Sequence, residues 1–346
     1  MLPQSARVFV TGGTGLVGSH VATQLVCLGN PVRALHRADS DVTYVAGLGC
    51  ELVVGDTRDE IETLAAAMAG CDAVVHTAAV TYVKLPWEKV REINVGGTER
   101  VMRAAARAGV KSVVHVSSVA VHGGRPGRSD ESSPTDAPLL PRELYARSKR
   151  EAEAVVHATA RELGLSATIL RPAAVYGERD RLFTPTVVRT LRLPVQFLLG
   201  DGHGTIAAVY AGNVADAVVT ALGATAPSPG ARAQGARIFD FGADNPLDQR
   251  QLYTALTRAL EVPFRPAPLP GAMVLAAARI ADAIGLRIPG AHELPLPRTV
   301  RLAIGPNPYG SEKIRAELGW SPPFSLDESL ERTARWVARE RRSFGI

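Results

Sequence analysis

The stretch Val8-Phe9-Val10-Thr11-Gly12-Gly13-Thr14-Gly15-Leu16-Val17-Gly18 decides the fold class of this chain. It begins as an apolar run typical of a buried strand and then passes through glycines into a segment of helical length. Glycines allow a sharp turn from strand to helix, and they let a diphosphate approach the helix N-terminus, whose N–H groups and dipole attract anions. We therefore expect a dinucleotide site here. The alternative is a glycine-rich turn that serves packing only.

Outward from this stretch, short apolar runs alternate with longer amphipathic ones, which is typical of a parallel sheet with crossover helices. We expect strands at residues 7–11, 32–36, 51–55, 73–77, 112–117 and 167–170, and helices at 15–28, 61–68, 87–108 and 142–163. The prediction is an α/β fold, a Rossmann-type doubly wound parallel sheet with a smaller C-terminal α/β substrate lobe. Residues 1–171 would bind NAD(P), and 172–346 would form mainly the lobe, with some elements returning to the sheet.

Composition and charge exclude several classes of protein. A net charge of +5 over 346 residues, without a lysine-rich tail or an aromatic stripe, argues against nucleic-acid binding. The three cysteines, Cys27, Cys50 and Cys71, include no Cys-x-x-Cys pair, so neither a disulfide framework nor a zinc site is expected. No histidine–carboxylate spacing suggests any other metal.

The chain is expected to be cytoplasmic. Its first predicted strand starts within a few residues of Met1, which leaves no room for a signal peptide, and no apolar run reaches membrane-spanning length. The apolar segment 272–286 is interpreted as a lid or lobe-core helix, with shallow peripheral membrane contact as the alternative.

Tyr145 and Lys149 lie four residues apart in Tyr145-Ala146-Arg147-Ser148-Lys149, which places both side chains on one face of a helix. A free phenol has a pKa of about 10, and a cation one helical turn away favours the phenolate. The expected strand Val113-Val114-His115-Val116 runs into two hydroxyls, Ser117 and Ser118, before this helix. A dinucleotide site, hydroxyl, tyrosine and lysine in this order make an oxidoreductase the leading hypothesis.

The end of the second strand bears on the choice of cofactor. A carboxylate there would bind a ribose 2′-hydroxyl, but the strand ends in Leu35-His36-Arg37. The Arg37 guanidinium could instead pair with a 2′-phosphate. Asp39 is a rival for the ribose, although Asp39-Ser40 is more typical of a helix N-cap. The sequence therefore favours NADP(H) over NAD(H).

At this point the chain resembles the extended short-chain dehydrogenase/reductase family, part of the NAD-dependent epimerase/dehydratase superfamily, over nearly its whole length. Its closest likeness is to the branch of 3β-hydroxysteroid dehydrogenases and dihydroflavonol reductases. The motifs that carry the resemblance are 11–18, Gly55-Asp56, His76-Thr77-Ala78-Ala79, Asn94-Val95-Gly96-Gly97-Thr98, Ser117-Ser118, 145–149, Arg171-Pro172-Ala173-Ala174-Val175-Tyr176-Gly177, Tyr210-Ala211-Gly212-Asn213-Val214-Ala215-Asp216 and Leu318-Gly319-Trp320.

The resemblance implies a role for each matching residue. Tyr145 would be the acid/base, Lys149 would lower its pKa and hold the nicotinamide ribose, Ser118 would bind the reacting oxygen, and Asn94 would support the site from behind. The implied cofactor contacts are Gly12, Gly15, Leu16, Val17, Gly18, Arg37, Asp56, Thr57, Thr77, Ala78, Ala79, Ser117, Tyr145, Lys149, Pro172, Ala173 and Val175. Asn94 could equally be a helix-packing amide, and His115 and His203 are interpreted as structural.

The same resemblance narrows the substrate. A dehydratase usually has a Thr-Asp-Glu run where this chain has Ser118-Val119-Ala120, and a sugar-nucleotide epimerase usually has diphosphate partners where it has Ala174 and Ile206. A bulky, mostly apolar ketone or secondary alcohol is therefore expected, in a pocket that includes Thr81, Tyr82, Trp87 and Phe183. A sugar-nucleotide epimerase and a catalytically silent NADP-binding sensor remain alternatives. A homodimer built on helices 87–108 and 142–163 is also implied.

Overall fold

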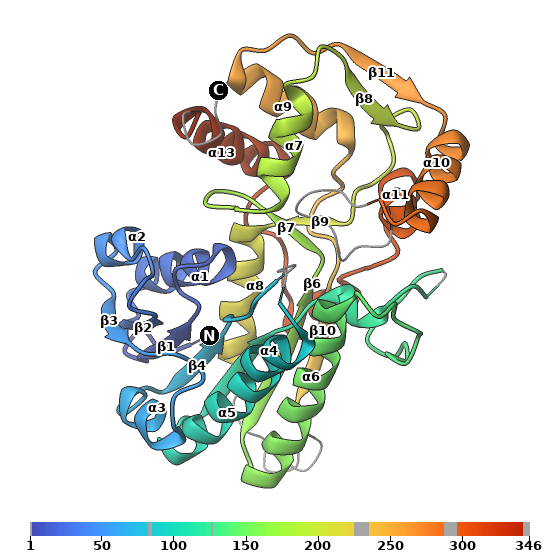
Figure 1. Ribbon diagram of the computed structural model, residues 1–346. Helices are drawn as coiled ribbons and strands as arrows, with labels where there is room; N and C mark the ends of the chain where they lie inside the picture. The colour runs from blue at the N-terminus through green and yellow to red at the C-terminus, as the bar shows by residue number, and fades with distance from the viewer. Residues whose placement is uncertain (1, 82–84, 126, 225–234, 287–295, 342–346) are drawn as a thin grey trace.

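A seven-stranded, wholly parallel sheet forms the centre of the molecule, with strand order β10-β6-β5-β4-β1-β2-β3 (Figure 1). The computed structural model of the chain describes residues 2–81, 85–125, 127–224, 235–286 and 296–341. The sheet strands are β1 (Val8–Thr11), β2 (Val32–His36), β3 (Glu51–Val54), β4 (Ala73–His76), β5 (Ser112–Val116), β6 (Ser166–Pro172) and β10 (Arg237–Phe241). The predicted doubly wound parallel sheet is confirmed.

Helices cover both faces of the sheet because its strands are apolar on both sides. In β1, Val8 and Val10 belong to the core under α1 and α8, whereas Phe9 points to the other core, under α3, α5 and α6. These helices are α1 (Leu16–Cys27), α8 (Ala211–Ala224), α3 (Ile61–Ala67), α5 (Gly97–Arg107) and α6 (Leu144–Leu163), and a short α2 (Thr43–Gly47) follows β2. The carboxyl ends of all seven strands consequently lie along one edge, where ligands of such sheets bind.

A smaller α/β lobe extends beyond that edge, at the top of Figure 1. Its core contains Tyr176, Leu256 and Leu330. It comprises two two-stranded sheets, β7 (Ala174–Tyr176) with β9 (Ala208–Tyr210) and β8 (Gln196–Leu199) with β11 (Pro266–Leu269), and the helices α7 (Phe183–Leu191), α9 (Gln249–Leu260), α10 (Gly271–Ala283), α11 (Leu296–Ile304) and α13 (Leu326–Arg339). Between these elements the chain returns to the main sheet, where β10 pairs with β6, α8 packs on α1 and α12 (Glu312–Leu318) packs on β10.

The segment predicted as one helix over 87–108 is interrupted. It consists of α4 (Trp87–Arg91), a π-helical turn η1 (Glu92–Gly96) and α5. A π turn inserts one residue into the helical ladder and turns a side chain inward, which is common at functional sites. Asn94 lies in this turn, and its side chain is buried. Helical periodicity does not reveal such a turn.

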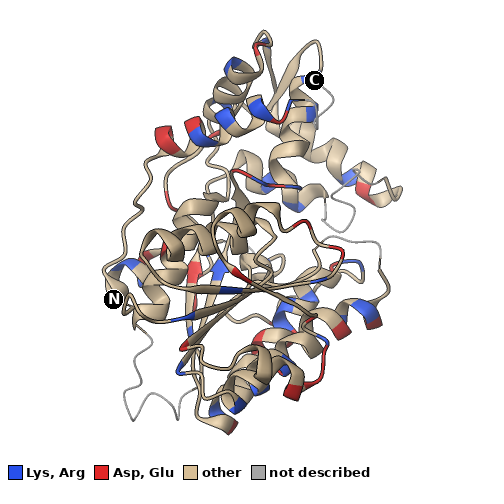
Figure 2. Ribbon diagram, turned by 90° about the vertical axis from the view of Figure 1, so that its left-hand side faces the viewer, with Lys and Arg blue, Asp and Glu red and all other residues tan. Residues whose placement is uncertain are grey.

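Over the described residues, charged side chains of both signs are interspersed and form no basic stripe (Figure 2). Within the described ranges, no helix is both long and apolar enough to cross a bilayer. The apolar segment predicted as a helix over 272–286 forms α10, which packs on α11 and leaves Met273, Ile280 and Ile284 exposed. No group of His, Cys, Asp or Glu side chains suited to a metal ion occurs in the part of the chain that the structure describes.

Candidate active site

The glycine loop is closed tightly on itself and on the end of β4. Gly12 has a φ of 71°, and a Cβ added there would lie 2.6 Å from Thr77 Oγ1. A Cβ on Gly18 would overlap Gly12 O and lie 2.7 Å from Gly12 C. α1 starts directly after this turn with no side-chain cap and no acidic residue in its first turn. Its amides and dipole therefore remain suited to an anionic ligand.

The segment after β4 runs beside this loop. Thr77 Oγ1 donates to Thr11 O at 2.8 Å, and the amide of Ala78 donates to Thr11 Oγ1 at 3.4 Å. The structure thus brings Thr77, Ala78 and the neighbouring Ala79, all predicted from the sequence, next to the glycine turn. A flat ligand above the sheet edge would touch both segments.

Asn94 connects this segment to helix α6. Its Oδ1 accepts a hydrogen bond from the Val80 amide at 2.8 Å, and its Nδ2 donates to Val80 O at 3.0 Å and to Ser148 Oγ at 2.9 Å. Ser148 in turn donates to Tyr145 O at 2.8 Å. Both faces of the amide are satisfied by protein groups, so Asn94 fixes the loop after β4 relative to the helix that carries Tyr145 and Lys149.

Tyr145 and Lys149 lie one turn apart at the start of α6, and Lys149 reaches the end of β5. Lys149 Nζ lies 5.8 Å from the centroid of the Tyr145 ring and donates to Val116 O at 2.8 Å. Lys149 is buried, and burial lowers the pKa of its ammonium group to about 8, against the opposing effect of the Glu153 charge. Ser118 begins the short 3₁₀ turn η2 (Val119–His122), where its Oγ accepts from the Ala120 amide at 3.2 Å.

The two adjacent serines have different surroundings. The Ser117 hydroxyl is buried and donates to Glu153 Oε1 at 2.5 Å. Ser118 has no such partner on α6, and its hydroxyl keeps its own proton for another acceptor because it accepts from Ala120. The side chain of Ser117 is thus committed to the protein interior, which leaves its backbone for any contact with a cofactor.

Two buried histidines, His76 and His115, lie close enough to Lys149 for its charge to act on them. Thr98 Oγ1 donates to Asn94 O at 2.6 Å and therefore accepts from His76 Nε2 at 3.0 Å, so His76 Nδ1 accepts from Thr11 Oγ1 at 2.7 Å. Burial, with a contribution from the Lys149 charge, lowers the pKa of His76 to about 3 and also lowers the pKa of His115. Both imidazoles are neutral, which agrees with the structural interpretation of His115.

The tips of β2 and β3 carry arginines. Arg37, with a side chain 60% exposed, pairs with Asp39 through Nε at 3.1 Å. Asp56 pairs with Arg58 through two hydrogen bonds of 2.9 Å, and this contact lowers the pKa of its carboxyl. Arg58 did not emerge from the sequence, because only the folded turn shows it bound to Asp56. Thr57 is buried and packs against Gly97.

The predicted nicotinamide end and pocket lie at the boundary with the lobe. Pro172 and Ala173 are buried and Val175 is partly buried, where the chain passes from β6 to β7. Phe183 starts α7 and is partly buried, as is Thr81. The Trp87 ring is covered by the Arg147 guanidinium, 3.7 Å above its centroid. Tyr82 lies outside the described residues.

A further residue of α6 belongs to this region although the sequence analysis did not select it. Glu153 lies one turn beyond Lys149 on the same helical face, and it binds Arg171 through bonds of 2.8 and 2.6 Å. The spacing Tyr-x-x-x-Lys-x-x-x-Glu was the available signal. Asp240, which pairs with Arg171, and His122, which bonds to Asp240, had no such signal, because they are 118 residues apart in the chain.

Comparisons with known proteins show which family this chain is similar to. A family model described as the NAD dependent epimerase/dehydratase family matches residues 8–232. The chain is 29% identical over 328 residues to a 4-hydroxy-2-methyl-3-oxo-4-farnesyl-3,4-dihydroquinoline-1-oxide ketoreductase of Stigmatella aurantiaca, covering 94% of this chain and 95% of the relative. It is 28% identical over 334 residues to a 3 beta-hydroxysteroid dehydrogenase/Delta 5-->4-isomerase of Mycobacterium tuberculosis, covering 94% and 88%. The solved structure of the dTDP-glucose 4,6-dehydratase DesIV from Streptomyces venezuelae, with NAD and TYD bound, matches with a TM-score of 0.70 and 27% identity over 98% of both chains.

Proposed function

Since the chain belongs to the NAD dependent epimerase/dehydratase family, as an extended short-chain dehydrogenase/reductase that uses NAD(P), we propose that it transfers hydride between NADP(H) and a bulky, mostly apolar ketone or secondary alcohol. The observation that carries the proposal is the buried Lys149 ammonium 5.8 Å from the Tyr145 ring, at the end of the strand that precedes Ser118. Two relatives that span nearly the whole chain are named as a ketoreductase and a hydroxysteroid dehydrogenase.

The residues divide the chemistry among them. The dinucleotide, when bound, supplies or accepts the hydride. In reduction, Tyr145 Oη donates a proton to the carbonyl oxygen, and in oxidation the phenolate takes the proton of the alcohol. Ser118 Oγ donates a hydrogen bond to the same oxygen, and the Lys149 ammonium stabilises the phenolate electrostatically. Asn94 fixes helix α6 relative to the loop after β4 through its bonds to Ser148 and Val80.

The chain's own residues also fit the cofactor. The glycine turn leaves no room for side chains at Gly12 and Gly18, so a diphosphate can approach the first amides of α1. The proposed contacts are those of the glycine turn, of 77–79, of Asp56-Thr57 and of 172–175, with Arg37 beside the adenine ribose. Residues 1–171 would thereby supply most of the cofactor contacts, and the lobe beyond them would cover the substrate.

Arg37→Ala is expected to weaken NADPH binding by about 10- to 100-fold and NADH binding by less than about twofold. A guanidinium forms charge-assisted hydrogen bonds with a 2′-phosphate that NADH lacks. Quenching of protein fluorescence gives both dissociation constants. Arg107→Ala is the control. It also removes one exposed cation, which pairs with Glu62 between α5 and α3, and it should leave both dissociation constants unchanged. Equal losses for the two cofactors would exclude a 2′-phosphate contact.

The test of the proposed function follows nicotinamide absorbance while the protein is incubated with cofactor and candidate substrates. The panel contains hydroxysteroids, their ketones, dihydroflavonols, aryl ketones and UDP-sugars. Turnover of a bulky ketone or alcohol is expected. Conversion of a UDP-sugar without net change in absorbance would favour the epimerase alternative, and cofactor binding with no turnover would favour the sensor.

We also propose that the protein is a homodimer through the exposed side of α4, α5 and α6. Ala154 and Ala158 lie one turn apart on the exposed face of α6, and small side chains allow two helices to approach closely. Light scattering at micromolar concentration is expected to give twice the chain mass of 36.6 kDa. A monomer mass would contradict the proposal.

A further inference from the structure

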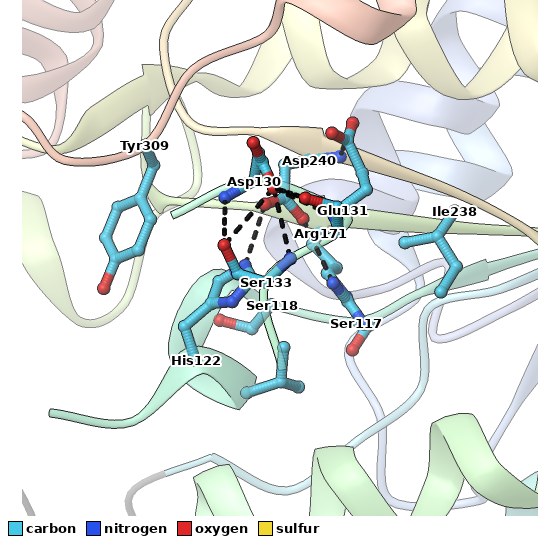
Figure 3. Close-up of polar contacts among 12 residues, drawn as sticks. Ser117, Ser118, His122, Asp130, Glu131, Ser133, Arg171, Ile238, Asp240 and Tyr309 are labelled. Carbon is cyan, nitrogen blue, oxygen red and sulfur yellow. Dashed lines mark hydrogen bonds and ion pairs between the residues drawn. The ribbon is translucent and has the colours of Figure 1, made fainter. Parts of the chain in front are cut away.

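Five buried side chains behind the candidate catalytic residues form one continuous polar cluster, here called the charge cluster. It lies at the carboxyl ends of β5, β6 and β10. Figure 3 shows Ser117, His122, Arg171 and Asp240 of this cluster. His122 Nε2 donates to Asp240 at 2.8 Å, Asp240 pairs with Arg171 at 3.4 Å, and Arg171 binds Glu153 through bonds of 2.8 and 2.6 Å. Ser117 completes the cluster at Glu153. No member is more than 5% exposed.

The charge cluster is attached directly to the end of β5. Lys149 and Glu153, one turn apart on α6, bind consecutive residues of the chain there, since Lys149 donates to Val116 O at 2.8 Å and Glu153 accepts from Ser117 Oγ at 2.5 Å. Ser118 follows immediately. The ammonium group and the nearest carboxylate are therefore held in a fixed relation by two short contacts to one strand end.

The cluster contains more negative than positive charge. Glu153 and Asp240 are two carboxylates, and Arg171 supplies the one permanent cation among the five side chains. His122 Nδ1 is buried and has no hydrogen-bond partner in the described structure. Because a carboxylate can only accept, the proton in the His122–Asp240 hydrogen bond is on His122 Nε2. Among the permanent charges alone, one carboxylate has no cation of its own inside the cluster.

Lys149 differs from the other cations around the cluster because it is bound at the same strand end as Glu153. His76 and His115, on the strand side of Lys149, are neutral, and burial lowers the pKa of His157, which lies one turn beyond Glu153 on α6. Glu131 contacts the Asp240 amide at 2.8 Å and adds carboxylate. Two further cations lie on neighbouring elements, where Arg150 donates to Val121 O and Lys313 to Ile238 O.

We infer that Glu153 and Asp240 together are the buried counter-charge that keeps Lys149 protonated, and that they are positioning residues for the reaction. Without a counter-charge, a fully buried ammonium group loses its proton because desolvation disfavours the charged form. The excess carboxylate offsets that cost at the point where the ammonium must hold the cofactor ribose and stabilise the Tyr145 phenolate. This inference rests on the role proposed above for Lys149.

The test measures NADP⁺ binding as a function of pH from 6.5 to 9.5, with fluorescence quenching as the readout. An ammonium donor binds ribose hydroxyls more tightly than an amine does, so the dissociation constant rises once Lys149 loses its proton. In the wild type, with a Lys149 pKa of about 8, this rise begins near pH 8. Glu153→Gln removes a negative charge that raises this pKa, so the rise should begin about one pH unit lower.

Asp240→Asn removes a charge that is farther from Lys149. The pH at which the NADP⁺ dissociation constant begins to rise should therefore shift in the same direction, but by less. Glu151→Gln is the matched control: it lies on the same helix but faces Arg91 and Arg147 at the surface, and its onset stays at the wild-type value. If Glu153→Gln does not fold, the pH dependence measured for Asp240→Asn decides whether the buried carboxylates act as the counter-charge. A structural role alone would lower stability without moving the onset.

Lys149→Met separates the two levels of the argument, since it should make binding independent of pH over this range. If it does, and neither carboxylate variant moves the onset, the counter-charge is refuted while the role of Lys149 stands. If Lys149→Met retains the wild-type pH dependence, Lys149 is not the titrating group, and both the inference and its proposed role fail.

Discussion

Tyr145→Phe is expected to lower kcat/KM by about 10²- to 10⁴-fold in both directions, the range that a lost general acid/base accounts for. The dissociation constant of NADPH should change by less than about twofold. Phenylalanine retains the ring and its place 5.8 Å from Lys149 Nζ, and it removes only the hydroxyl that exchanges the proton. Steady-state rates on the substrate found in the panel, together with fluorescence titration of NADPH, give the two quantities.

The matched control is Tyr44→Phe. Tyr44 lies on α2, where its hydroxyl contacts Thr23 at 2.9 Å on the exposed side of α1, away from α6. Its loss should change kcat/KM by less than about twofold, since a surface substitution of this kind has little effect on stability. Wild-type turnover in Tyr145→Phe would remove the acid/base assignment, and loss of NADPH binding would show that the phenol serves cofactor binding instead.

Gly18→Ala should abolish tight cofactor binding, with a loss of about 100-fold or more, and destabilise the protein by about 1–3 kcal/mol. The added Cβ would overlap Gly12 O, and it would lie 2.7 Å from Gly12 C and 2.8 Å from Thr77 Oγ1. Two of these three atoms belong to the backbone, so α1 must move away from the glycine turn. That movement displaces the amides that face the diphosphate.

Urea denaturation and NADPH titration of Gly18→Ala measure the two effects. Gly47→Ala is the control because a Cβ at Gly47, within α2, would meet no atom within 4 Å. Alanine is the better helix former, so this variant should be as stable as the wild type or more stable, with unchanged NADPH binding. Wild-type affinity in Gly18→Ala would show that the turn is not the diphosphate site.

The strands of the main sheet were predictable because central parallel strands are apolar on both faces and end at polar or glycine residues. Val8–Thr11 and Ala73–His76 follow that pattern, and the structure has them at those positions. The helix expected over 87–108 was only partly right. Its π turn depends on the bonds from Asn94 to Val80 and Ser148, and these come from segments that local sequence does not relate.

The sequence by itself determined the glycine turn and the Tyr145–Lys149 pair, because each consists of residues close together in the chain whose geometry follows from one local element. Only the tertiary structure decided the environment of that pair. Ser117, His122, Arg171 and Asp240 are brought together by β5, β6 and β10, which are neighbours in the sheet but distant in sequence. Burial changes the charge state of such groups, and burial is a property of the assembled layers, so no local pattern contains it.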